Sequence, residues 1–258
     1  MTGDQYFNGM AERYRRRIYG GPKGEIRMGI VWDDLLEGIP GLVDGPPLNI
    51  LDAGGGQGQM SIRLARQGHR VVLAEPSADM LAYARRDIEA AGVEDRVTLV
   101  RAPVQELDAH LDQRFDLVVC HAVLEWLADP APVVPRLTEF LAPGGSLSLM
   151  YYNARATVFR SLLWGDFGKI RSGELGSRRK KRFTPITPLE PESVDQWLEQ
   201  AGLDAVLCSG IRTFYDYMPR ESRELAALDE VLEMERRFSR QDPYRWLGRY
   251  IHVLCRLA

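Results

Sequence analysis

The residues with the clearest chemical potential form a glycine-rich turn after a short apolar segment. Residues 49–53 (Asn-Ile-Leu-Asp-Ala) lead into glycines at 54, 55, 56 and 58. Glycines at alternate positions let the backbone turn sharply and approach a ligand closely, because no Cβ intervenes. A dinucleotide-binding loop instead requires Gly-x-Gly-x-x-Gly, and Gln59 stands where its third glycine would be. The spacing therefore favours S-adenosylmethionine, a nucleoside ligand without phosphate, and disfavours an NAD-dependent dehydrogenase.

Polar side chains also follow the next apolar segments. Glu75 closes one of them, and its carboxylate can accept hydrogen bonds from both hydroxyls of a ribose. Val104 and Gln105 follow another, where an apolar wall and an amide could hold an adenine, and His121 closes a third. An open parallel sheet binds its ligand beyond the carboxyl ends of its strands, so we expect these side chains to share one site with the glycine turn.

Alternating strands and helices are predicted to position these residues. Residues 6–38 read as helical with a break at 20–22, and a regular alternation begins after Pro46-Pro47. Predicted strands cover 48–53, 70–75, 97–101, 115–121, 146–151, 203–211 and 249–257. Predicted helices cover 58–67, 77–91, 130–142, 191–201 and 220–240. Near-continuous apolar strands separated by helices predict an α/β fold whose parallel sheet is covered on both faces.

The bulk composition is that of an ordinary globular protein. The chain has 258 residues, 45% of them hydrophobic and 27% charged, and we expect one domain over 1–258. Within it we expect an N-terminal helical lid or substrate segment at 1–46 and a cofactor-binding half at 47–153. A basic insertion at 154–190 and the C-terminal part of the sheet at 191–258 follow. No membrane-spanning run, signal-peptide layout or metal-ligand spacing is visible, so we expect a cytoplasmic protein without a metal. Three separated cysteines in predicted strands are expected to be buried and reduced: Cys120, Cys208 and Cys255.

Positive charge is concentrated in two segments although the net charge is −3. Residues 12–27 hold six basic side chains against two acidic ones, and residues 169–182 hold seven against one. The second segment lies in the predicted insertion. Paired basic clusters in an otherwise acidic chain favour contacts with a polyanion.

Motifs outside the glycine turn narrow the interpretation. The turn and the strand pattern resemble the class I S-adenosylmethionine-dependent methyltransferases. Further motifs resemble, within that superfamily, the tRNA 5-carboxymethoxyuridine methyltransferase family: residues 11–14, 18–20, 23–27, 121–126, 152–154 and 247–253. The similarity covers nearly the whole chain, including the N-terminal helices and the insertion. It implies a Rossmann-like, seven-stranded, mostly parallel sheet whose last two strands form a reversed pair.

The resemblance also implies a set of S-adenosylmethionine-binding residues. They are Arg27, Gly54, Gly55, Glu75, Val104, Gln105 and His121. Family members often carry Asp at the position of Glu75, and the longer side chain keeps the same pair of acceptor oxygens. Arg27 is distant from the turn in sequence, and a guanidinium suits the carboxylate of the methionine part.

The implied reaction forms the methyl ester of 5-carboxymethoxyuridine at the wobble position of tRNA. A carboxylate is already an anion at neutral pH, so its attack on a sulfonium methyl group needs no general base and no catalytic acid–base residue is expected. Candidates for positioning the substrate are Arg212, Arg249, Tyr14, Tyr19 and Tyr152. Candidates for contacting RNA are Arg178, Arg179, Lys180, Lys181, Arg182, Arg15, Arg16 and Arg17.

Two other functions remain open on the sequence. A small-molecule carboxylate or O-methyltransferase of the same fold would keep the whole cofactor site but show no salt-sensitive RNA binding. A non-catalytic RNA-binding module would bind the cofactor without transferring its methyl group. Neither the oligomeric state nor the tRNA isoacceptors can be read from the residues.

Overall fold

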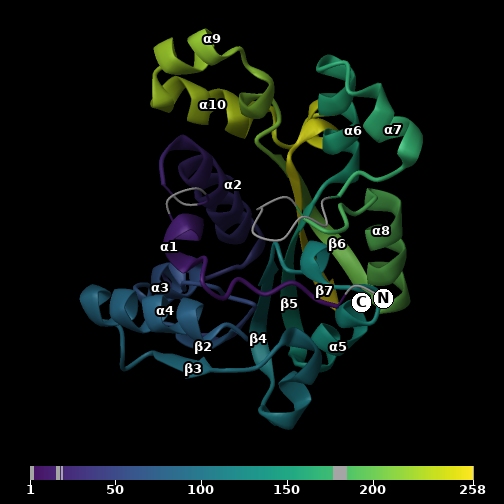
Figure 1. The fold of residues 1–258 in the computed structure, drawn as a ribbon. Coiled ribbons are helices and arrows are strands. Elements are labelled where there is room, and N and C mark those ends of the chain that lie inside the picture. The colour runs from purple at the N-terminus through teal and green to yellow at the C-terminus, as the bar shows by residue number, and fades with distance from the viewer. Residues whose placement is uncertain (1–2, 16–17, 19, 177–184, 258) are drawn as a thin grey trace.

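The computed structural model describes residues 3–15, 18, 20–176 and 185–257, and its centre is a single sheet (Figure 1). Within these residues seven strands occur in the order β3-β2-β1-β4-β5-β7-β6. They are β1 (Asn49–Ala53), β2 (Arg70–Ala74), β3 (Val97–Val100), β4 (Phe115–His121), β5 (Leu141–Tyr152), β6 (Leu203–Ile211) and β7 (Tyr250–Leu257). Only β7 runs antiparallel to its neighbours β5 and β6, so the predicted mostly parallel sheet with a reversed final pair is confirmed.

Helices of the described chain lie on both faces of this sheet and beyond its edge (Figure 1). The α-helices are α1 (Ala11–Tyr14), α2 (Pro22–Gly38), α3 (Gln59–Ala65), α4 (Ala78–Ala91), α5 (Val133–Glu139), α6 (Ala154–Leu163), α7 (Phe167–Ser172), α8 (Pro191–Gln200), α9 (Arg220–Leu225) and α10 (Leu228–Phe238). Short 3₁₀ turns are η2 (Val104–Ala109), η3 (Leu124–Trp126), η4 (Tyr215–Tyr217) and η5 (Tyr244–Leu247). The boundaries of α4 follow its sequence signals: the Ser77 side chain accepts a hydrogen bond from Met80 N, and Gly92 ends the helix with φ 64°.

Two apolar cores result from the alternation of side chains along each strand. Leu117 and Val119 of β4 belong to a core shared with α2, α3 and α4. Val118 and Cys120 of the same strand belong to the other core, shared with α5 and α8. Successive side chains of a strand point to opposite faces, so a strand that is apolar throughout needs cover on both sides. The near-continuous apolar strands of the sequence are explained by this arrangement.

Several details of the predicted elements were wrong. The helix predicted at 130–142 ends at Glu139, and β5 begins at Leu141 rather than at residue 146. Residues 6–10 are not helical, because this segment bonds to other parts of the chain; Gly9 N, for example, donates to Asp79 Oδ2 at 2.5 Å. The helix predicted at 220–240 is interrupted at Ala226 and Ala227, whose backbones are extended. Cys208 is only partly buried, whereas Cys120 and Cys255 are buried as predicted.

Candidate functional site

The glycine turn joins β1 to α3 at the carboxyl edge of the sheet. Gly54 has φ 80° and Gly56 has φ 58°, a region that disfavours residues with side chains. A Cβ on Gly54 would lie 2.4 Å from Val123 Cγ2, whereas a Cβ on Gly56 would meet nothing within 4 Å. The first glycine therefore permits close packing against the loop after β4, and the second leaves an open surface at a cavity.

Glu75 faces this turn from the end of β2. Its Oε2 accepts a hydrogen bond from Gly56 N at 3.2 Å, and its Oε1 accepts one from Ser77 N at 3.0 Å. The side chain is buried, and burial raises the pKa of Glu75 to about 7 against the opposing effect of these two donors. A carboxylate held by backbone donors but not by a cation is placed to accept further hydrogen bonds from a ligand.

A pocket with about 570 Å³ of empty space lies between Glu75 and the turn after β3. Its walls include Gly54, Gly56, Glu75, Val104, Gln105 and His121, together with residues 5–7 of the N-terminal segment. Gln105 Nε2 donates to Asp4 Oδ2 at 2.8 Å, while Gln105 Oε1 is buried with no hydrogen-bond partner in the structure. A cavity of this size with a buried unsatisfied acceptor suits a nucleoside.

A second pocket adjoins the first and shares Gly54, Gly56 and His121 with it. Arg27 of α2 lines it and is 3% exposed, and its guanidinium carbon lies 4.3 Å from the centre of the Tyr250 ring. Asp52 lines it too; burial raises the pKa of Asp52 to about 6, although Ser61 Oγ donates to this carboxylate at 2.6 Å. Opposite charges thus face one small cavity, as the charged end of an amino acid would require.

All seven residues predicted to bind the cofactor line one or both of these pockets: Arg27, Gly54, Gly55, Glu75, Val104, Gln105 and His121. Sequence reasoning missed Asp52, although it belongs to the glycine motif itself. It also missed Tyr6 and Phe7, because they were assigned to a helix. The non-helical segment before α1 has no sequence motif as recognisable as a glycine turn.

A cluster of cations lies beyond Arg27 around one buried carboxylate. Asp216 lies 2.9 Å from Lys23 Nζ, 3.3 Å from Arg212 Nη2 and 4.0 Å from Arg249 Nε. Burial alone would raise the pKa of Asp216, but Arg212, Lys23 and Arg249 outweigh it and hold that pKa at about 2. Three cations share one anion, so the cluster keeps an excess of positive charge.

Donors within this cluster remain unused. Arg212 Nε and Arg249 Nη1 are buried and have no hydrogen-bond partner among the residues that the structure describes. Arg212 also has φ 59°, an uncommon backbone conformation for a residue with a long side chain. Both arginines were predicted as positioning residues, and the structure brings them together on one carboxylate.

Two tyrosines connect the cation cluster to Arg27. Tyr152, a predicted positioning residue, packs edge-on against Tyr250, with ring centroids 5.3 Å apart. Arg249 lies over the Tyr152 ring at 4.8 Å, and Arg212 over the Tyr250 ring at 5.3 Å. Because Arg27 also lies over Tyr250, the second pocket and the cation cluster are neighbours separated by one aromatic ring.

A third pocket, with about 620 Å³ of empty space, opens on the far side of Tyr152 and Arg249. Its walls include Arg160 of α6, Trp164 directly after that helix, and Lys169 of α7. Trp164 is 73% exposed, which is unusual for the largest apolar side chain. This pocket combines cations with an aromatic surface within the described part of the predicted insertion.

Most of the predicted RNA-contacting residues lie outside the described residues. This applies to Arg178, Arg179, Lys180, Lys181, Arg182, Arg16 and Arg17, and to the positioning candidate Tyr19. Arg15 is described and forms an ion pair with Asp87 at 2.9 Å. Tyr14 is the last residue of α1.

No group of three or more His, Cys, Asp or Glu side chains in the described part of the chain is arranged to hold a metal ion. Among the helices described, none has the length and apolar character needed to cross a membrane.

Comparisons with known proteins agree with this geometry. A methyltransferase domain model matches residues 51–149, the segment from β1 into β5. The tRNA 5-carboxymethoxyuridine methyltransferase of Escherichia coli K12 is 40% identical over 254 residues, which is 98% of this chain and 96% of that protein. The ubiquinone biosynthesis O-methyltransferase of Xylella fastidiosa is 29% identical over 163 residues, covering 63% of each chain.

A solved structure shares the fold at low sequence identity. Magnesium protoporphyrin IX methyltransferase from Synechocystis, with bound S-adenosylmethionine, superimposes with a TM-score of 0.59 and 17% identity over 98% of this chain and 94% of its own. This likeness establishes the Rossmann-like methyltransferase fold predicted from the sequence.

Proposed function

Because the chain belongs to the tRNA 5-carboxymethoxyuridine methyltransferase family, we propose that it transfers the methyl group of S-adenosylmethionine to the carboxylate of 5-carboxymethoxyuridine at the tRNA wobble position. The product is the methyl ester, formed in the cytoplasm. One observation carries this proposal: 40% identity extends over 98% of the chain and thus includes the N-terminal helices and the insertion. The relative that acts on a small molecule matches 63% of the chain.

The two adjoining pockets fit the proposed cofactor. Glu75 would accept hydrogen bonds from the ribose hydroxyls, and the unsatisfied Oε1 of Gln105 would accept one from the adenine amino group beside Val104. Arg27 would hold the carboxylate of the methionine part in the second pocket. When bound, S-adenosylmethionine supplies an electrophilic methyl group on a positively charged sulfur. The acids that line the pockets suit such a cation.

The cation cluster fits the substrate carboxylate. Arg212 Nε and Arg249 Nη1 are donors without partners, and together with Lys23 they outnumber the single carboxylate of Asp216. We assign them to one oxygen of the substrate carboxylate, so that the other oxygen keeps its nucleophilicity. Asp216 limits how strongly the arginines can withdraw charge from the nucleophile.

No proton transfer is required in this reaction. The substrate carboxylate is ionised at neutral pH, so the chain needs to align it with the methyl group and exclude water. Alignment of this kind can contribute about 7–11 kcal/mol to lowering the barrier. Tyr152 and Tyr250 form the apolar boundary at which the two partners would meet.

The insertion supplies the surface for the RNA strand in this proposal. Trp164 is exposed enough to stack on an unpaired base, and Lys169 and Arg160 beside it can contact phosphates. The basic run 178–182, outside the described residues, would extend that surface. Neutralising three of its side chains is expected to weaken tRNA binding and flatten its salt dependence, with the affinity for S-adenosylmethionine unchanged.

The decisive experiment offers two substrates to the same enzyme. The protein is incubated with methyl-labelled S-adenosylmethionine and either tRNA that lacks the ester or free 5-carboxymethoxyuridine, and the nucleosides are then separated. We expect the labelled methyl ester from tRNA and little from the free nucleoside. Equal rates on both would favour a small-molecule carboxylate methyltransferase. Binding of the cofactor without any labelled ester would favour a non-catalytic RNA-binding module.

A further inference from the structure

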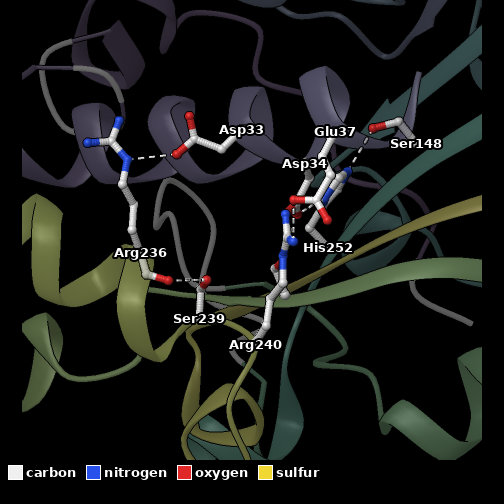
Figure 2. Close-up of polar contacts among 9 residues, drawn as sticks. Asp33, Asp34, Glu37, Ser148, Arg236, Ser239, Arg240 and His252 are labelled. Carbon is white, nitrogen blue, oxygen red and sulfur yellow. Dashed lines mark hydrogen bonds and ion pairs between the residues drawn. The ribbon is translucent and has the colours of Figure 1, made fainter. Parts of the chain in front are cut away.

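A chain of buried hydrogen bonds runs from α2 to the cofactor pockets. Asp34 Oδ2 lies 2.6 Å from His252 Nδ1, and His252 Nε2 lies 2.8 Å from Ser148 Oγ (Figure 2). Ser148 Oγ is also 2.8 Å from His121 Nε2. Asp34, Ser148 and His252 are at most 1% exposed, and His121 lines both pockets. Four residues from α2, β7, β5 and β4 are thereby joined in one line.

The carboxylate at one end sets the direction of every hydrogen bond in this line. Burial alone would raise the pKa of Asp34, but its hydrogen bonds with His252, Arg240 and Ser209 lower it, so the group is ionised and only accepts. Arg240 already supplies a cation to Asp34, with Nη2 2.6 Å from Oδ1 (Figure 2). Because Asp34 only accepts, His252 carries a proton on Nδ1, and since Arg240 already balances the charge of Asp34 we take this as the only proton on the ring.

The positions of the remaining protons follow because the Ser148 hydroxyl has only one hydrogen to donate. A neutral His252 with a proton on Nδ1 presents Nε2 as an acceptor, so the Ser148 hydroxyl donates to it. Ser148 Oγ must then accept from His121, which places the His121 proton on Nε2. Burial lowers the pKa of His121 well below its usual value, and the nearby Arg27 guanidinium lowers it further, so this ring is neutral.

The tautomer leaves His121 Nδ1 with a free lone pair. Ser148 is the only hydrogen-bond partner of the His121 side chain among the described residues. The second pocket, which His121 lines, also contains the Arg27 guanidinium, the group suited to an amino-acid carboxylate. The other charged group of an amino acid is an ammonium, which has three donors and needs acceptors.

We propose that Asp34, His252 and Ser148 are positioning residues that hold His121 in the Nε2–H tautomer, so that His121 Nδ1 accepts a hydrogen bond from the ammonium group of S-adenosylmethionine. The inference rests on the proposed cofactor but not on the identity of the methyl acceptor. Asp34 and Arg27 are seven residues apart on α2, two helical turns, so they lie on the same side of that helix. One helix therefore presents the group for the ligand carboxylate and orients the acceptor for its ammonium.

Replacing Asp34 by Asn is expected to reverse the direction of every hydrogen bond between residue 34 and His121. Arg240 and Ser209 both donate to Asp34 Oδ1, so the amide oxygen of Asn would stay with them and its NH₂ group would face His252. His252 would then carry its proton on Nε2 and donate to Ser148, and Ser148 would donate to His121. The His121 proton would move to Nδ1, where it opposes an ammonium.

The tautomers can be read directly without any ligand. The protein has four histidines, so ¹⁵N NMR of histidine-labelled apoprotein gives an assignable set of ring nitrogens. At neutral pH we expect His252 protonated only on Nδ1 and His121 only on Nε2, with both reversed in Asp34→Asn. A doubly protonated His252, or a wild-type His121 protonated on Nδ1, would overturn the proposal.

Ligand binding provides the second measurement. S-adenosylhomocysteine and 5′-methylthioadenosine are compared by calorimetry, because only the first carries the amino-acid group. For S-adenosylhomocysteine we expect a loss of about tenfold or more in Asp34→Asn, the range for a hydrogen bond to a charged group, and of about threefold to tenfold in Ser148→Ala, the range for an ordinary hydrogen bond. For 5′-methylthioadenosine both variants should stay within about twofold of wild type, since the contact to the ammonium is missing.

Ser209→Ala is the matched control. Ser209 is as buried as Ser148 and donates to the same Asp34 at 2.8 Å, but it does not lie between Asp34 and His121. Ser209→Ala should leave the tautomers of His121 and His252 unchanged, and also the preference for S-adenosylhomocysteine over 5′-methylthioadenosine. Equal losses for both ligands, or equal losses in Ser148→Ala and Ser209→Ala, would show a merely structural role. These readouts involve no tRNA, so a failure to form the methyl ester would leave this inference standing.

Discussion

The cofactor pockets and the cation cluster are electrostatic opposites on the two sides of Tyr250. On the pocket side, burial raises the pKa of Asp52 to about 6 and that of Glu75 to about 7, and neither forms an ion pair within the described residues. On the cluster side, three cations hold the pKa of Asp216 at about 2. One region is short of positive charge and the other is short of negative charge.

The difference indicates which ligand each region is built for. A sulfonium nucleoside brings positive charge to the acids, and a substrate carboxylate brings negative charge to the arginines. Because the protein alone leaves charge unbalanced in both regions, each would be stabilised by the ligand proposed for it. Variants should therefore separate the two binding steps cleanly.

The largest effect is expected from the cluster. Arg212→Ala should lower kcat/KM for tRNA about 100-fold, because it removes a buried charged donor from the substrate carboxylate. The affinity for S-adenosylmethionine, measured by calorimetry, should stay unchanged. Arg236→Ala is the control, since Arg236 forms an exposed ion pair with Asp33 (Figure 2) and should have little effect on either value. Full activity in both variants would remove Arg212 from the site.

The second-largest effect is expected at Glu75, one of the two buried acids of the cofactor pockets. Glu75→Gln should weaken S-adenosylmethionine binding about tenfold, because one of the two charged acceptors for the ribose is lost. The same change should stabilise the apoprotein at pH 8 by about 1–3 kcal/mol, since it removes a buried carboxylate that folds with a raised pKa. That gain should vanish below about pH 4, where Glu75 is protonated in both the folded and the unfolded state. Thermal unfolding at the two pH values checks the sign.

A smaller effect is expected at the exposed tryptophan. Trp164→Ala should raise the KM for tRNA about tenfold through the loss of stacking, whereas Trp164→Phe should retain most of the affinity. The side chain is 73% exposed, so neither change should alter thermal stability. An unchanged KM in both variants would place the RNA strand elsewhere.

The smallest effect is expected in the pH dependence of ligand affinity, which should differ between the cofactor pockets and the cation cluster. Affinity for S-adenosylmethionine should rise severalfold between pH 6 and pH 8, because Glu75 must lose its proton as its pKa of about 7 is passed. Glu75→Gln should flatten this profile. The cluster should show no comparable change, since Asp216 is ionised throughout that range. A rise in affinity on acidification would contradict the comparison.

The sequence predicted those parts of the molecule that depend on local pattern. The order of strands and the residues at their carboxyl ends follow from alternation and from a glycine turn, which is why Gly54, Glu75 and His121 were found together. The break at Ala226 has no such signal, because alanine is a good helix former. There the tertiary contacts of Glu235, which accepts hydrogen bonds from the backbone of Thr213 and Tyr215, fix where α10 lies.

Contacts between distant segments could not be predicted in the same way. Asp34 and His252 are 218 residues apart, and only the fold shows that their side chains meet. Asp216 follows Arg212 by four residues, but its role as the shared anion of Arg212 and Arg249 depends on the loops after β6 and before β7 lying side by side. Patterns in a single sequence therefore predict local structure well but predict contacts between distant segments poorly.

In the proposed assignment of the nucleoside pocket, the orientation of one amide would determine which base is accepted. Asp4 can only accept, so the Gln105 NH₂ group must face it and the carbonyl oxygen must face the pocket. With adenine beside it, that oxygen meets the amino group at position 6. Hypoxanthine carries a carbonyl at the same place, so S-inosylhomocysteine would set oxygen against oxygen and bind far more weakly than its adenine counterpart.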